Sequence, residues 1–118
     1  MTIRDAVRRL RTDPEQLERK RLRERFGHRG LTPIDALPLR RHASVGGEVI
    51  RMTVRPRSGI PSFEVVIGDG TGVAVAVFTG RRSIAGVDHG RAMIIEGVAR
   101  DERGRRVMLN PAYTLLPD

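Results

Sequence analysis

Arginine supplies almost all of the positive charge of this 118-residue chain, and it is the residue type best placed to do chemistry. The chain holds 22 Lys+Arg against 14 Asp+Glu, a formal net charge of +8, and Lys20 is its only lysine. A guanidinium group can hold a phosphate by two parallel hydrogen bonds. An excess of positive charge this large favours a polyanionic partner or an acidic surface. We therefore single out eight candidate nucleic-acid-binding residues: Arg51, Arg55, Arg57, Arg81, Arg82, Arg103, Arg105 and Arg106.

A glycine-rich stretch raises the question of a phosphate-binding loop. It reads IGDGTGVAVAVFTGRRSIAG and spans residues 67–86. Such a loop needs a lysine and a Ser or Thr after its last glycine, and then a helix that supplies amide donors. Here Gly72 is followed by an alternating apolar pattern that predicts a strand. Asp69-Gly70 is a strong hairpin pair, because glycine accepts the positive φ of such turns. We interpret the stretch as a hairpin turn, and the arginines after it, Arg81 and Arg82, as either phosphate ligands or solvated surface residues.

The residue types that carry catalysis or metal binding are scattered. His28, His42 and His89 lie in different segments with no partner at metal-ligand spacing, and the chain has no cysteine. No serine stands in a nucleophile elbow, and no pair of carboxylates is evident. We expect a protein that is not an enzyme and that needs neither metal nor cofactor.

The elements that must position the arginines are predicted to be mainly strands. Alternating or β-branched segments separated by turn residues predict five of them, at residues 44–56, 62–69, 72–80, 91–101 and 105–116, the last interrupted at Asn110-Pro111. This order predicts a mainly β fold, a five-stranded Greek-key barrel of the oligonucleotide/oligosaccharide-binding (OB) type. In such a barrel the loops between strands one and two and between strands four and five flank the ligand cleft. Both loops are rich in arginine here.

The chain divides into three predicted parts. Residues 1–30 form a basic helical arm, with Asp13 as a cap and Pro14 in the first helical position. Residues 31–42 form a linker that packs on the barrel, and residues 43–118 form the barrel itself.

The barrel segment resembles a known family. The motifs DGTG, GRR followed by Ile84 and Gly86, and NPAY near the end occur together and in order. They resemble a small actinobacterial OB-fold family that is regarded as nucleic-acid binding. The pattern is also similar to the wedge domain of the branch-migration helicase RecG and to the anticodon-binding domain of class II aminoacyl-tRNA synthetases. On the register that this resemblance implies, Phe63 and Phe78 face the core, while Glu64, Val66, Val75 and Val77 face outward.

Two functions follow as expectations. The first is a non-enzymatic binding module that contacts the phosphate backbone of single-stranded or branched DNA or RNA. The second is a protein-interaction or self-association adaptor that uses the barrel face and the N-terminal helices; the shortage of aromatic residues, 3% of the chain, favours it. No apolar run approaches the roughly 20 residues of a membrane helix, and no signal peptide is expected. A cytoplasmic protein without a membrane partner is therefore predicted.

Overall fold

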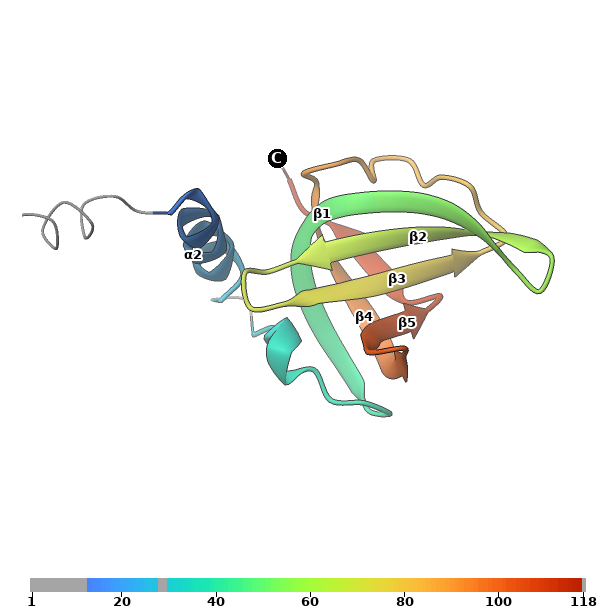
Figure 1. Ribbon diagram of the computed structural model, residues 1–118, viewed down its shortest axis with the longest axis horizontal. Coiled ribbons are helices and arrows are strands. Elements are labelled where there is room, and N and C mark those ends of the chain that lie inside the picture. Colours follow the sequence, from blue (N-terminus) through green and yellow to red (C-terminus); the bar gives the residue numbers. More distant parts are fainter. Residues whose placement is uncertain (1–12, 28–29, 118) are drawn as a thin grey trace, which may run out of the picture.

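The computed structural model describes residues 13–27 and 30–117 and shows a mainly β chain with one α-helix in that part (Figure 1). The elements are, in order, α2 (Pro14–Phe26), the 3-10 turn η1 (Ile34–Ala36), β1 (His42–Arg57), β2 (Ile60–Gly68), β3 (Val73–Thr79), β4 (Ala92–Glu102), β5 (Arg105–Leu109) and β6 (Ala112–Leu115). The predicted fifth strand is thus two strands. Asn110 lies between them with a left-handed φ of 47° and breaks the ladder.

The strands close into a ring. β1 pairs with β2 and β2 with β3, both antiparallel, while β5 joins β3 in parallel and β4 antiparallel. β4 then returns to β1, so that the ring runs β1-β2-β3-β5-β4-β1, and β6 adds to β4. β1 is long and strongly curved, and it takes part in both halves of the ring (Figure 1).

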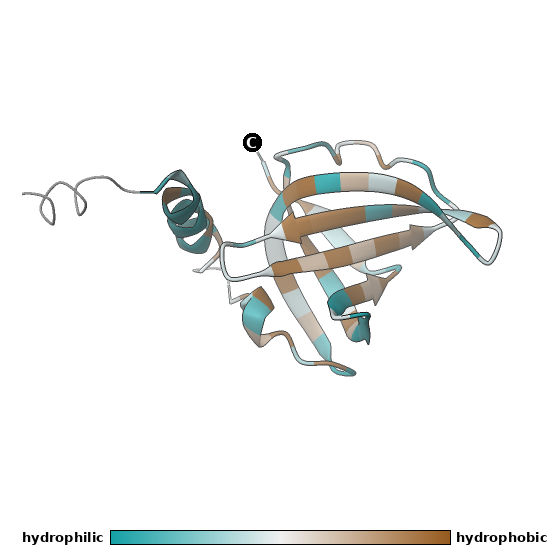
Figure 2. Ribbon diagram, in the orientation of Figure 1, coloured by the Kyte–Doolittle hydropathy of each residue, from teal (hydrophilic) through white to brown (hydrophobic). Residues whose placement is uncertain are grey.

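The main core fills the inside of this ring. Alternate residues of the strands point inward, and apolar colour follows the strands in Figure 2, whereas α2 is hydrophilic along most of its length. Phe63 and Phe78 belong to this core and are almost fully buried, as the register of the family resemblance implied. From the linker, Ile34 and Leu37 enter the same core, whereas Leu39 stays exposed.

The β2–β3 turn fixes the linker to the ring. The buried carboxylate of Asp69 accepts hydrogen bonds from the backbone N–H of Thr71 (2.9 Å), from its hydroxyl (2.6 Å) and from the N–H of Gly72 (3.2 Å). Its other oxygen accepts the N–H of Ile34 at 2.9 Å. The glycines of this stretch therefore form the hairpin turn between β2 and β3. Its aspartate, Asp69, stabilises the turn and binds the linker to it.

Polar residues cap the start of α2 and attach the helix to β1. The N–H of Glu15 donates to the Asp13 side chain at 3.0 Å, and Pro14 follows the cap. Arg21 and Arg25 both pair with Glu48 of β1, and Phe26 is buried against the outside of the ring. Of the predicted arm, residues 1–12, 28 and 29 lie outside the described residues.

Candidate functional site

Three of the predicted arginines share the outward side of β1. Arg51 stands opposite Val66 of β2, Arg55 opposite Ser62 and Arg57 opposite Ile60. Directly opposed residues project to the same face of a sheet. The residues of β2 that alternate with Ser62 and Val66, such as Phe63, face inward to the core. A bulge between Val49 and Arg51 sets this register.

A buried carboxylate lies among these arginines. Glu64 of β2 has a relative exposure of 4% although its strand position faces outward. Its oxygens lie 3.9 Å from Arg55 Nε, 3.8 Å from Arg57 Nη2 and 3.5 Å from Arg105 Nη1. A buried charge is tolerated when it is paired. Glu64 therefore holds three guanidinium groups, from β1 and β5, around one point.

A second carboxylate connects the two hairpins that carry the arginines. Glu102, at the end of β4, accepts hydrogen bonds from Arg57 (2.8 and 3.2 Å) and from Arg100 (2.5 and 2.8 Å). Hydrogen bonds from Arg57, and then from Arg100, lower the pKa of Glu102 to about 2, and the bond to Glu102 raises the pKa of Arg57. The β1–β2 hairpin is thus tied to the β4–β5 hairpin by ion pairs. We call this set the arginine network: Arg55, Arg57, Arg100, Arg105, Glu64 and Glu102.

The floor beside the network is aliphatic. Val66, Val75, Val77 and Val107 form a small buried cluster on the outward side, separate from the main core. Among the described residues no aromatic ring lies in this cluster. Tyr113, of β6, packs edge to face on Phe78 with ring centroids 5.6 Å apart. This face therefore presents charged side chains over a buried aliphatic layer rather than a stacking platform.

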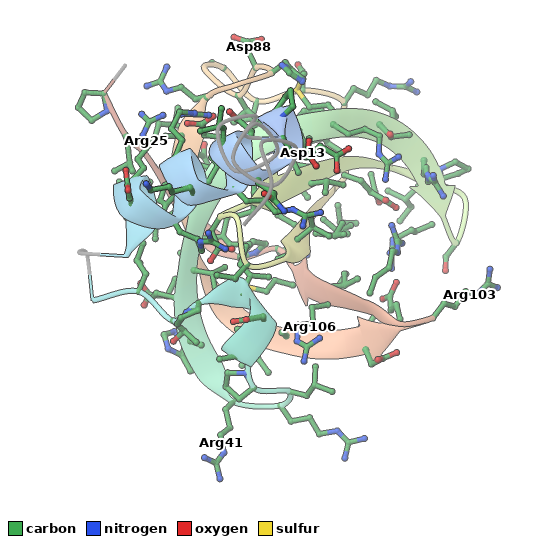
Figure 3. All side chains as sticks on the ribbon, turned by 60° about the vertical axis from the view of Figure 1, so that its left-hand side comes forward. Asp13, Arg25, Arg41, Asp88, Arg103 and Arg106 are labelled. Carbon is green, nitrogen blue, oxygen red and sulfur yellow. The ribbon has the colours of Figure 1, made fainter. Side chains whose placement is uncertain are left out.

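Four predicted arginines are exposed and unpaired. Among the residues that the structure describes, no hydrogen bond or ion pair is made by the side chains of Arg51, Arg81, Arg82 and Arg103. Arg81 and Arg82 follow β3, where the N–H of Gly80 donates to the Pro61 carbonyl at 2.8 Å and so brings them to the β1–β2 hairpin. Arg103 forms the tip of the β4–β5 hairpin (Figure 3).

Arg106 is not brought to the network. Its Nε donates to the Leu37 carbonyl at 3.0 Å, so that its half-buried side chain fixes the linker, and in Figure 3 it lies apart from Arg103. Sequence reasoning missed Arg100 and Glu102 as members of the site. The only signal was the alternation of charges in ARDERGRR, which does not reveal a partner on another hairpin.

Other kinds of site find little support in residues 13–27 and 30–117. No group of three or more His, Asp or Glu side chains there could hold a metal ion. His42 lies 3.3 Å from Glu96 in an exposed pair. No helix in this part of the chain has the length and apolar character needed to cross a membrane.

A scan of protein-family models gave no match to this chain, and a search of curated proteins gave no significant one.

Proposed function

We propose that the ring is a Greek-key barrel of the OB type and that it binds the phosphate backbone of single-stranded or branched nucleic acid without catalysing a reaction. The ring of five strands, β1-β2-β3-β5-β4-β1, supports this fold, because an OB barrel is a five-stranded, partly open barrel. The ligand face of that barrel lies on its second and third strands, between the loops joining strands one to two and four to five. The arginine network supports this assignment, because its members come from the β1–β2 and β4–β5 hairpins and meet at Glu64 of β2.

The observation that carries the proposal is the gathering of arginines from two hairpins on one face. The network holds four arginines against two carboxylates, a net charge of +2. Positive charge is added by four exposed arginines on β1, after β3 and at the β4–β5 turn: Arg51, Arg81, Arg82 and Arg103. Guanidinium groups held in place by Glu64 and Glu102 lose less side-chain freedom when a phosphate arrives. The site is therefore suited to bind backbone phosphates of any sequence.

Such binding depends strongly on salt, because condensed counterions are released from the nucleic acid. Contacts to about four phosphates of a single strand give a log–log slope of roughly −3. The test is fluorescence anisotropy of labelled single-stranded DNA, single-stranded RNA and a forked duplex at three salt concentrations. Binding with that slope supports the proposal, and the order of affinities identifies the ligand.

Two variants test the location of the site. Arg81→Gln with Arg82→Gln removes two exposed charges and leaves the network intact, so the fold is expected to be unchanged. Arg55→Gln with Arg57→Gln cuts into the network. Each pair is expected to weaken binding to all sequences alike, by about tenfold, and to reduce the salt slope by about 1.4. The matched control is Arg40→Asn with Arg41→Gln, which removes the same charge from the exposed end of the linker. Equal losses in the control and both site variants would contradict the location.

A second function has its own observation. Ile50, Met52 and Val54 of β1 are 46%, 37% and 44% exposed, an unusual amount of apolar surface on one strand. They support an adaptor that docks a protein or a second copy of the chain. Light scattering after size exclusion, over a hundredfold range of concentration, tests self-association. A strictly monomeric protein that binds oligonucleotides tightly would leave only the first function.

A further inference from the structure

The outward side of β1 continues past the arginine network to helix α2. Near its middle β1 carries Glu48, which pairs with Arg21 of the helix. Ile50 comes next and is exposed, and Arg51 follows it on the outward side. One strand thus connects the docked helix to the site proposed above.

A groove of about 690 Å³ lies at this junction, between α2 and the β2–β3 turn. It is lined by Arg19, Leu22, Arg23, Asp35, Ile50, Gly68, Gly70, Thr71, Gly72 and Val73. Its apolar surface includes Ile50 and Val73, which are 46% and 55% exposed. Three glycines, Gly68, Gly70 and Gly72, also line the groove and put no side chains into it, which leaves room for a flat group.

Two of the arginines of α2 form ion pairs with β1, and two others line the groove. Arg21 and Arg25 are occupied by Glu48. Arg19 and Arg23 line the groove, are exposed, and have no ion pair or side-chain hydrogen bond with any described residue. Asp35 is the single carboxylate in the lining, so the groove carries a net charge of +1 and is complementary to an anion.

Close packing of α2 on the β2–β3 turn fixes the position of Arg19 and Arg23 over the groove. A Cβ at Gly70 would lie 2.2 Å from the carbonyl oxygen of Arg19 and 2.9 Å from Cγ of Arg23. Gly70 also has a φ of 88°, which favours glycine. Only a residue without a side chain lets the helix backbone approach the turn so closely. The helix is therefore held against the turn, with its two free arginines over the groove.

We propose that this groove is a second subsite for the same nucleic-acid strand, and this inference rests on the function proposed above. A base or sugar lies on Ile50 and Val73, and the adjoining phosphate binds Arg19 and Arg23. Single-stranded nucleic acid fits this chemistry, because its bases present faces that are stacked in a duplex. Arg55 lies five positions after Ile50 on β1, about 17 Å away at the usual rise of a strand. A very short oligonucleotide therefore cannot occupy both the network and the groove.

The length of the oligonucleotide is the test. Labelled oligothymidylates of four and twelve nucleotides are titrated with the full chain and with Arg19→Gln plus Arg23→Gln. The variant is expected to bind the twelve-mer about tenfold more weakly, with a salt slope smaller by about 1.4. Its affinity for the four-mer is expected to change less than twofold. Ile50→Ser is expected to weaken the twelve-mer without changing the salt slope, because it removes apolar contact and no charge.

The controls separate the failure of this inference from the failure of the proposed function. Arg40→Asn with Arg41→Gln removes two exposed charges elsewhere, and circular dichroism with thermal unfolding checks that each variant is folded. If wild-type protein binds neither oligothymidylate and neither the single-stranded RNA nor the forked duplex of the first test, both proposals are wrong. If it binds the RNA or the forked duplex but neither oligothymidylate, the function stands and the groove subsite is overturned. If the Arg81 and Arg82 variant weakens both lengths while the Arg19 and Arg23 variant behaves like the control on both, the function stands and the groove subsite is overturned.

Discussion

Replacing Glu102 by glutamine tests whether the ion pairs between the two hairpins stabilise the fold. Glutamine keeps the size of the side chain and removes its charge, so Arg57 and Arg100 lose their common carboxylate. The pKa of Glu102 lies at about 2 instead of 4.5, first because of the hydrogen bond from Arg57. A lowered pKa in the folded state means that the ionised carboxylate favours folding.

The size of the effect follows from this pKa. Each pKa unit corresponds to about 1.36 kcal/mol, so a fall from 4.5 to about 2 is worth at most ~3 kcal/mol. The Glu102 side chain is 22% exposed and that of Arg100 is 52% exposed, so water and salt screen the pairs. We expect Glu102→Gln to lower the free energy of unfolding by about 1–2 kcal/mol at pH 7.

The sign of the pH dependence is fixed by the same pKa. The folded pKa is depressed, so the stabilisation is fully present above about pH 4.5 and is lost as the pH falls toward 2. Urea unfolding of wild type and variant at pH 7 and at pH 2.5 measures it; urea is uncharged and does not screen the pairs. The difference between the two proteins is expected to shrink at pH 2.5 to less than half of its value at pH 7. Glu24→Gln, an exposed change on α2, serves as the control. A difference at pH 7 no larger than the control's, or one that persists unchanged at pH 2.5, would refute the reasoning.

Three further predictions concern the parts that hold the site in place. Gly70→Ala is expected to destabilise the protein by about 1–3 kcal/mol, because its φ is positive and its Cβ would meet the Arg19 carbonyl; thermal unfolding measures this, and an unchanged midpoint would contradict the contact. Asp69→Ala is expected to cost about 3 kcal/mol or more, because the N–H of Ile34 and the donors of the turn lose a buried acceptor; urea unfolding would show a loss well below this if the turn can rearrange. Glu48→Gln is expected to loosen α2, because two arginines of the helix pair with this carboxylate, whose pKa those bonds lower; proteolysis at the helix should accelerate at pH 7, and no change would mean that apolar contacts alone dock it.

The inward and outward faces of the strands could be predicted from the sequence. The register implied by the family resemblance assigned Phe63 and Phe78 to the core and placed Glu64 outside it, and the pairing of β1 with β2 agrees. The hairpin pair Asp69-Gly70 predicted the turn between β2 and β3 for a local reason, the φ of Gly70. Local signals of this kind depend on residues that are neighbours in the chain.

The site itself depends on closure of the ring, and no local pattern contains that information. Arg57 meets Glu102 because the ladders β1–β2, β2–β3, β3–β5 and β4–β5 together carry the β1–β2 hairpin to the β4–β5 hairpin. Arg106 belongs to the same basic run as Arg105, yet alternation sends its side chain to the opposite side, where it bonds the Leu37 carbonyl. A count of arginines in a loop therefore overstates the number that can act together.

The join between β3 and β5 has a consequence for how the ring opens. Only three residue pairs form it, whereas seven join β1 to β4. Asn110 extends this short seam: its N–H donates to the Val77 carbonyl at 2.7 Å, and its side-chain oxygen accepts the N–H of Thr79 at 2.9 Å. A ladder with few pairs is held by few hydrogen bonds and opens more easily than a long one. The β3–β5 ladder has the fewest pairs in the ring, so we expect it to open first, and while it is open β3 and β5 expose bare strand edges to other chains. The two hydrogen bonds of Asn110 therefore help to keep the edges of β3 and β5 covered.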